Sequence, residues 1–323
     1  MNRRDFLRAT TAAGLAGALS RSLQGAERPM TFQGKLPRRK IGNTDIMASL
    51  CGMGGVVAMR EKPERVRELV AEAMDLGVNY FDIAPTYGNA EELMGPVLQP
   101  HRDKIVIACK TQKRDRKGAA EELRQSLKTL KTDRFDVYQM HAITDVEKDV
   151  KRAMQDDGAI RAFEDAKKEG LVRYLGFSAH SVEAATAALD AFDFDTVLYP
   201  VNCVCHHEGN FVEPVLEKAG EKGAGVIAIK AVAKAPWPKG TPKEDKLPKA
   251  WYQAFTEDER MRLCLKWTLS RPGVAATVPS GNVDLFLRTI KMATDLGEPT
   301  KEELATIEAM AQGKDPLFAF PRG

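Results

Sequence analysis

Two kinds of segment alternate along the chain. Short, continuously apolar runs are followed by longer stretches in which apolar residues recur three or four positions apart. In residues 63–76, for example, Val66, Leu69, Val70 and Ala73 share one helical face. The apolar runs predict strands buried on both faces, and the periodic stretches predict amphipathic helices.

The alternation repeats eight times. Strands are expected at residues 47–53, 78–82, 104–109, 135–140, 172–177, 196–201, 226–229 and 274–278. Helices are expected at residues 63–76, 90–98, 119–130, 158–169, 182–189, 212–222, 258–270 and 283–296. Eight such units predict an α/β fold that closes into a (β/α)8 TIM barrel rather than an open doubly wound sheet.

Three further segments complete this expectation. Residues 35–45, with a turn at Gly42 and Asn43, predict an N-terminal β-hairpin that closes the bottom of the barrel. Residues 301–312 predict an extra C-terminal helix. Residues 231–256 form a long connection rich in Pro and Trp, and long loops after barrel strands are usually functional or disordered. We expect a lid over the mouth of the active site.

The composition is that of a soluble globular protein: 43% of the residues are hydrophobic, 29% are charged, and the net charge is +3. No basic stripe with interleaved aromatic residues is present, which argues against a nucleic-acid partner. No apolar run reaches the roughly 20 residues that a stable membrane span requires. The five cysteines show no disulfide framework and are expected to be small buried residues.

The N-terminus has a different character from the rest. Arg3 and Arg4 precede Phe6 and Leu7, and a weakly apolar run rich in Ala and Gly follows. This order resembles a twin-arginine export signal. We therefore expect a leader at residues 1–30, a single barrel domain at residues 31–323, an interaction with the twin-arginine export machinery and a periplasmic or otherwise exported location. A disordered basic tail is the alternative.

Polar side chains follow three successive predicted strands. Asp82 ends the second strand, Tyr87 lies in the loop after it, Lys110 ends the third and His141 ends the fourth. Active sites of such barrels lie at the carboxyl ends of the strands, and neighbouring strands are about 5 Å apart. The four side chains can therefore converge.

These residue types suit the reduction of a carbonyl group. Hydride addition creates an alkoxide that needs a proton, and Tyr87 can supply it if the ammonium of Lys110 lowers the pKa of the phenol. Asp82 can hold Lys110, and His141 can orient the carbonyl oxygen. Taken singly, each residue also has an ordinary structural explanation: a helix cap, a strand-end lysine, surface packing or a core histidine.

Three motifs in order resemble the aldo-keto reductase family. They are Gly77 to Gly88 with Glu91 and Gly95, Ile105 to Thr111, and Tyr138 to His141. The resemblance covers residues 35–296 and implies that Asp82, Tyr87, Lys110 and His141 form the catalytic tetrad of that family. It also implies NADP(H) as cofactor, with NAD(H) as the alternative, and a small-molecule carbonyl or alcohol as substrate.

The resemblance also implies a set of cofactor-binding residues. They are Ser178 and Asn202 near the nicotinamide amide, Ile229 against its ring with Lys230 following, Ser280 and Gly281 at the phosphates, and Arg288 at a 2′-phosphate. The chain departs from the family at Ala179, where Asn is usual, at Leu198, where Gln is common, and at Ile229, where an aromatic residue is common. A solvated helix face is the alternative for Arg288.

The segment Cys203 to Glu208 is rich in metal-ligand types but lacks a zinc-finger spacing. It is consistent with loop packing, with a substrate-pocket role or with metal binding through Cys205, His206 and His207, and the favoured interpretation assigns no metal. The sequence thus predicts an NAD(P)-dependent oxidoreductase acting on an aldehyde, ketone, sugar or polyol. The rivals are a cofactor-binding regulatory protein on the same barrel and a metal-dependent enzyme.

Overall fold

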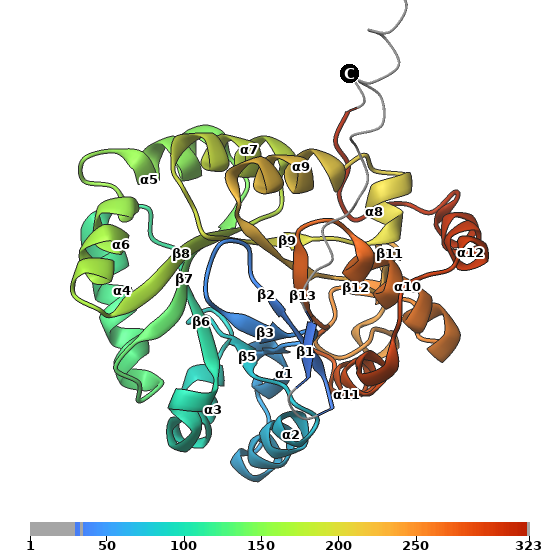
Figure 1. Ribbon diagram of the computed structural model, residues 1–323, viewed down its shortest axis with the longest axis horizontal. Helices are drawn as coiled ribbons and strands as arrows, with labels where there is room; N and C mark the ends of the chain where they lie inside the picture. Colours follow the sequence, from blue (N-terminus) through green and yellow to red (C-terminus); the bar gives the residue numbers. More distant parts are fainter. Residues whose placement is uncertain (1–29, 33–34, 322–323) are drawn as a thin grey trace, which may run out of the picture.

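The computed structural model describes residues 30–32 and 35–321, so the twin-arginine motif and most of the expected leader lie outside the described residues. Eight parallel strands form the central sheet (Figure 1). They are β4 (Met53–Gly54), β5 (Tyr80–Asp82), β6 (Val106–Thr111), β7 (Phe135–Ile143), β8 (Val172–Ala179), β9 (Thr196–Pro200), β10 (Gly225–Ile229) and β13 (Val274–Val278). They lie side by side in chain order, which is the expected barrel topology.

Hydrogen bonds between the first and last strands complete the barrel. Cys51, just before β4, forms a parallel bridge with Thr277 of β13. Gly52 N donates to Thr277 O over 2.9 Å, and Thr277 N donates to Leu50 O over 2.8 Å. The predicted (β/α)8 barrel is confirmed.

Helices surround the strands as a ring (Figure 1). The α-helices are α1 (Gly55–Ala58), α2 (Pro63–Asp75), α3 (Ala90–Leu98), α4 (Arg116–Thr129), α5 (Arg152–Met154), α6 (Ala159–Lys168), α7 (Val182–Ala191), α8 (Cys203–His207), α9 (Glu213–Lys222), α10 (Asp258–Ser270), α11 (Val283–Met292) and α12 (Lys301–Ala311). Short 3-10 helices cover Gln99–Lys104, Lys243–Asp245 and Ala293–Asp295, and a π-helix covers Val146–Lys151. The expected extra C-terminal helix is α12, which packs against α8 and α10.

An antiparallel sheet closes the amino-terminal end of the barrel. It consists of β1 (Met30–Phe32), β2 (Pro37–Lys40) and β3 (Met47–Ser49), with the turn between β2 and β3 over the start of β10. Gly42 in this turn has a φ of +47°, and a Cβ there would lie 2.3 Å from Gly225 N. The turn therefore requires glycine both for its conformation and for its close approach to β10.

The structure corrects one sequence-based boundary and adds detail to the expected lid. The single strand expected at residues 47–53 is divided, because Met47–Ser49 pairs with β2 in the hairpin and only Met53–Gly54 joins the barrel. The expected lid contains a small antiparallel hairpin of β11 (Ala233–Pro236) and β12 (Tyr252–Ala254). No helix of the described residues is long and apolar enough to cross a membrane.

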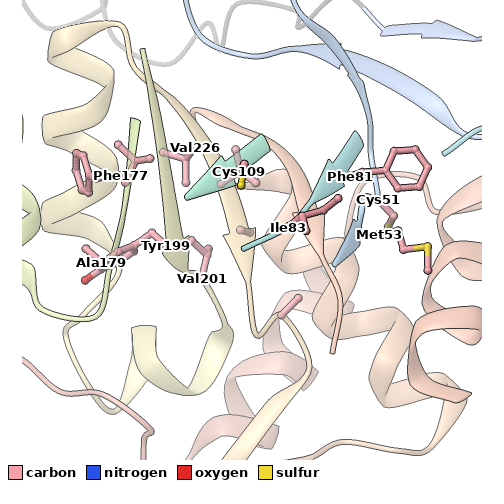
Figure 2. Close-up of a cluster of buried hydrophobic side chains, with 14 of the residues drawn as sticks. Cys51, Met53, Phe81, Ile83, Cys109, Phe177, Ala179, Tyr199, Val201 and Val226 are labelled. Carbon is pink, nitrogen blue, oxygen red and sulfur yellow. The ribbon is translucent and has the colours of Figure 1, made fainter. Parts of the chain in front are cut away.

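The core has two layers because side chains alternate between the faces of each strand. The outer layer lies between the strands and the helices, and includes Phe81, Cys109 and Tyr199 (Figure 2). The inner layer fills the barrel and includes Tyr80, Ala108, Val137, Leu198, Ile227 and Val278. All five cysteines are buried and free, as expected.

Candidate active site

Alternation along the strands places the predicted site residues above the inner core. Asp82 follows the interior residue Tyr80 by two positions, and Lys110 follows Ala108 by two. Both therefore point toward the barrel axis, at the carboxyl ends of β5 and β6. The neighbouring residues Phe81 and Cys109 point outward into the helix layer (Figure 2).

Asp82 and Lys110 form a buried ion pair. Lys110 Nζ lies 2.6 Å from Asp82 Oδ1, and the Lys110 side chain is 0% exposed. The ammonium also donates to Ile83 O over 3.3 Å. Burial lowers the pKa of Lys110, but Asp82 and Tyr87 raise it, and the net direction is upward. Lys110 is therefore a permanent cation at neutral pH.

Tyr87 lies beside this cation on the loop after β5. The ammonium of Lys110 is 5.1 Å from the centre of the phenol ring, and the ring packs against the backbone of Gly55 in α1. Burial raises the pKa of Tyr87, whereas Lys110 lowers it through its charge and a hydrogen bond; the net direction is upward. The expected lowering by Lys110 is thus present but outweighed, and the phenol is protonated at neutral pH.

His141 completes the group from β7. Its ring centre is 5.6 Å from that of Tyr87, and its Nδ1 lies 3.3 Å from the Thr86 hydroxyl oxygen. Burial, with the charges of Lys110, Arg114 and Lys230, lowers the pKa of His141 to about 3. The imidazole is therefore neutral near pH 7 and can donate a hydrogen bond through one nitrogen only.

The end of β7 is irregular at this point. The pairing with β8 shifts between Met140 and Ile143, and Ala142 has a φ of 54°. Ala142 N donates to the Ser178 hydroxyl over 2.6 Å, and Arg114 donates to His141 O over 2.7 Å. A bulge of this kind changes the direction of a side chain. Here it fixes His141 in place beside Tyr87.

A cavity of about 290 Å³ lies over these residues. The tetrad members that line it are Asp82, Tyr87 and His141, with Lys110 buried just beneath. Its other walls come from every part of the barrel mouth. They include Gly54, Val56, Ser178, His180, Leu198, Ile229, Lys230, Lys249, Trp251, Tyr252, Val278, Pro279, Ser280 and Gly281.

The wall at β8, β9 and β10 suits a flat, amide-bearing ring. Leu198 and Ile229 supply apolar surface, and Ser178 is beside them. Because the Ser178 oxygen accepts from Ala142 N, its hydroxyl proton remains available to a ligand. These residues fit a nicotinamide even though Asn is not present at position 179 and Gln is not present at position 198. The residues at these positions, Ala179 and Leu198, are both buried.

The wall before α11 suits phosphate groups. Ser280 and Gly281 line the cavity directly before this helix, and a Cβ on Gly281 would lie 2.3 Å from Val56 Cγ1. Asn282 caps the helix by accepting from Leu285 N over 3.0 Å. The start of a helix offers free backbone N–H groups to anions. The described residues thus fit a nicotinamide dinucleotide at both walls.

Two predicted cofactor residues do not line the cavity. Asn202 is 0% exposed and caps α8, with its Oδ1 accepting from Cys205 N over 2.8 Å. Arg288 is held by Asp258 and Asp284 at the surface. A contact between Arg288 and a 2′-phosphate stays a prediction and requires the exchange of these ion pairs.

The lid borders the cavity, and its Lys249 is bound to residues that follow β4. Lys249, Trp251 and Tyr252 of the lid all line the cavity, as expected for a cover of the mouth. Lys249 Nζ donates to Val57 O over 2.7 Å and to Glu61 Oε1 over 2.6 Å. The lid is therefore attached to the segment that follows β4.

The segment Cys203 to Glu208 forms α8 and packs into the helix layer. Cys203 Sγ lies 4.0 Å from Cys264 Sγ, and His206 Nδ1 lies 2.6 Å from Glu213 Oε2. Within the described part of the chain, no three His, Cys, Asp or Glu residues are grouped so as to hold a metal ion. The contacts of this segment are those of packing.

Sequence reasoning missed His180 among the cavity residues and did not single out Lys249 within the expected lid. Both lie on loops whose path the apolar pattern does not specify. Trp251 and Tyr252 line the cavity as aromatic residues of the expected lid. For His180 the signal was its position directly after the Ser178-Ala179 strand end.

The barrel brings Tyr87, Lys110, Asp82 and His141 together at the carboxyl ends of its strands. The chain belongs to the aldo/keto reductase family, whose model matches residues 52–312.

Individual relatives are distant. The uncharacterized oxidoreductase YqkF of Bacillus subtilis (strain 168) is 35% identical over 155 residues, which cover 44% of this chain and 48% of YqkF. L-galactose dehydrogenase of Arabidopsis thaliana is 29% identical over 223 residues, covering 62% of this chain and 66% of that protein. The matches thus span about half to two thirds of these relatives.

The fold is also found in solved structures. The aldo-keto reductase AKR11C1 from Bacillus halodurans (holo form) superposes with a TM-score of 0.68 at 22% identity, covering 87% of this chain and 98% of that one.

Proposed function

We propose that this protein is an NAD(P)(H)-dependent oxidoreductase that interconverts a carbonyl compound and its alcohol. The observation that carries the proposal is the group of Tyr87, His141, Lys110 and Asp82 at one cavity. When bound, the nicotinamide supplies or accepts the hydride. The substrate is an aldehyde, ketone, sugar or polyol, and NADP(H) is the cofactor expected from the family.

The chain's own residues handle the oxygen and its proton. His141, neutral because of its low pKa, donates to the carbonyl oxygen and orients it. Tyr87 gives its proton to the same oxygen as negative charge develops there. The ammonium of Lys110 stabilises the phenolate that remains, and Asp82 holds Lys110 in position. In the oxidation direction, Tyr87 takes the proton back.

The cofactor assignment rests on the two walls that fit it. Ser178 and Ile229 are proposed at the nicotinamide, and Ser280 and Gly281 at the phosphates. Asn202 does not line the cavity; it caps α8 by accepting from Cys205 N. Arg288 remains a proposed contact to a 2′-phosphate.

The test is oxidation of NADPH and of NADH against a panel of aldehydes, ketones and sugars, with Tyr87→Phe as the matched variant. We expect turnover by the wild type and a loss of about 10²–10⁴-fold in the variant, the range for removal of a general acid. Equal background rates for both proteins would favour the second candidate, a cofactor-binding regulatory protein. That candidate is motivated by Ala179, Leu198 and Ile229, which replace the usual contacts to the cofactor.

We also propose export by the twin-arginine route, on the strength of Arg3 and Arg4 before Phe6 and Leu7. Such export carries folded proteins, so a cofactor bound in the cavity can travel with the barrel. Fusion of residues 1–30 to a reporter should export it, and replacement of both arginines by lysine should stop export. Retention of the unaltered fusion inside the cell would contradict the proposal.

A further inference from the structure

A second buried lysine borders the cavity. Lys230 follows β10 directly and is 8% exposed. Unlike Lys110, it forms no ion pair with any carboxylate of the described residues. Desolvation by burial lowers its pKa to about 7, and the one electrostatic effect that opposes this comes from the Cys205 thiol.

His180 is its hydrogen-bond partner. Lys230 Nζ lies 2.9 Å from His180 Nε2. An ammonium has three donors and no acceptor, so Nε2 accepts and the proton of the neutral imidazole is on Nδ1. Two ammonium hydrogens then have no hydrogen-bond partner among the described residues, and both His180 and Lys230 line the cavity.

Aromatic rings surround the rest of the ammonium. Lys230 Nζ lies 5.5 Å from the ring centre of Trp251 in the lid and 5.7 Å from that of Phe318 in the C-terminal tail. The tail is held there by the bond from Phe320 N to Gly209 O and by stacking of Phe318 on Phe211. These rings favour a cation but leave it without a counter-ion.

The backbone at Lys230 is strained. Its φ is 62°, in the left-handed region that costs a non-glycine residue about 1–2 kcal/mol. Strain of this kind is concentrated at functional sites. Five other non-glycine residues of the described segments have a positive φ, and two of them, Ala142 and Lys249, also lie at this site. The fold therefore holds an amine in the wall of the cavity whose ammonium form has no counter-ion among the described residues.

We propose that Lys230, oriented by His180, is an anion subsite for the substrate, which is a carbonyl compound or alcohol that carries a carboxylate, such as a sugar acid or an oxo acid. The inference rests on the proposed function and narrows its substrate class. The carboxylate accepts the two free ammonium hydrogens, and the carbon skeleton packs on Trp251, which lines the cavity. The other anion that enters this cavity is the cofactor's diphosphate, for which Ser280 and Gly281 already provide a place.

The activity test compares substrates that differ by one carboxylate group: glucuronate with glucose, and succinic semialdehyde with butanal. The variants are Lys230→Met, Lys230→Arg and, as a matched control, Lys234→Met in β11, which does not line the cavity. We expect the wild type to prefer each carboxylate, and Lys230→Met to lose about 10- to 100-fold in kcat/KM for it, the value of a hydrogen bond to a charged group. The loss should appear in KM and exceed any change with the neutral partner. Lys230→Arg should keep part of the preference, and Lys234→Met should keep all of it together with the wild-type rates on neutral substrates.

The binding test needs no turnover. Gluconate is titrated calorimetrically into the protein, with and without NADP⁺, at pH 8 in two buffers of different ionisation enthalpy. A carboxylate on Lys230 raises its pKa, so binding should take up a proton in the wild type and not in Lys230→Met. The affinity of each variant for NADPH is measured in parallel.

Three outcomes overturn the inference. Equal kcat/KM for the charged and neutral partners in the wild type does so without any variant, even if Lys230→Met fails to fold. A weaker affinity for NADPH in Lys230→Met, with the substrate preference intact, assigns the anion to the cofactor instead. Absence of proton uptake on gluconate binding removes the subsite. A lack of turnover on every substrate counts against the proposed function alone, and the calorimetric result then decides the subsite.

Discussion

Lys110 and Lys230 are both buried beside one cavity, but their surroundings differ. Lys110 has the carboxylate of Asp82 at 2.6 Å, and its pKa is raised despite complete burial. Lys230 has a neutral imidazole and two aromatic rings, and its pKa is lowered to about 7. A counter-ion therefore decides whether a buried lysine is a fixed charge or one that responds to what binds it.

The two lysines also differ in what surrounds them in the fold. Lys110 is on a barrel strand and its partner Asp82 is on the adjacent strand. Lys230 contacts His180, the lid through Trp251 and the tail through Phe318, so its surroundings come from three separate segments. We infer that the Lys110 side supplies the chemistry common to the family, and the Lys230 side selects the substrate.

The largest effect is expected from Lys110→Met. The phenolate of Tyr87 loses its neighbouring cation, so kcat should fall by about 10²–10⁴-fold on charged and neutral substrates alike. Lys230→Met is the matched variant, and its kcat on neutral substrates should remain within about threefold of the wild type. Steady-state kinetics on butanal and succinic semialdehyde measures both. A similar loss in kcat for the two variants would contradict the division of roles.

The next largest effect concerns stability. Asp82→Asn leaves the Lys110 ammonium buried without its counter-ion, and the loss of one partner of such a pair costs about 3–5 kcal/mol. Denaturant unfolding at neutral pH should show this decrease. The double variant Asp82→Asn/Lys110→Met removes both charges and should recover a large part of it. A double variant no more stable than the single one would show that the ion pair itself stabilises the fold, and that the loss does not come from a buried charge left without a partner.

The contrast between the two lysines also explains how much of the site could be predicted from the sequence. Asp82, Tyr87, Lys110 and His141 follow adjacent strands, so the barrel pattern alone brings their backbones together. The division of residues 47–53 between β3 and β4 was missed because an apolar run does not show which strand it pairs with.

The other half of the site depends on long-range contacts. His180 and Lys230 are 50 positions apart and meet at the barrel mouth, where the loops converge. Phe318 reaches them only because the chain returns after α12 and is fixed at Gly209. The sequence offered Lys230 as a candidate through its resemblance to the family, but not its partners or its missing counter-ion.

The pH dependence of stability separates the two lysines further. The pKa of Lys230 is about 7 in the folded protein, below the value of about 10.4 for an unfolded lysine, so between these values the unfolded chain binds more protons. Stability should therefore rise as pH increases from 7 to 10, by at most about 4 kcal/mol from this group. Lys230→Met should lack this rise and be more stable than the wild type at pH 7.

The groups that face Lys230 do not obscure this measurement. His180 on the β8 side and His141 on β7 have pKa values of about 3. Burial raises the pKa of Cys205 in α8 above its usual 9.0, so this thiol opposes the rise only above about pH 9 and does so in both the wild type and Lys230→Met. Trp251 and Phe318 do not titrate. Lys110 has a raised pKa, so its own contribution is lost only above pH 10. If the free energy of unfolding changed with pH in the same way in the wild type and in Lys230→Met, the pKa of Lys230 would not be lowered in the folded protein.

The smallest effect is expected at the lid, whose Trp251 lies beside Lys230. Glu61→Gln removes the charge that Lys249 contacts at 2.6 Å, while the bond from Lys249 to Val57 O can remain. The pair is partly exposed, with side chains 15% and 28% accessible, so the loss should be about 1 kcal/mol or less. Opening of the lid should become a few times more frequent, seen as faster proteolytic cleavage within residues 231–256.

Glu64→Gln is the matched control. It removes the same charge from the exposed pair with Arg67 and should leave cleavage unchanged. If Lys249 fastens the lid, only Glu61→Gln should also weaken the preference for carboxylates, because that preference needs Trp251 in place beside Lys230.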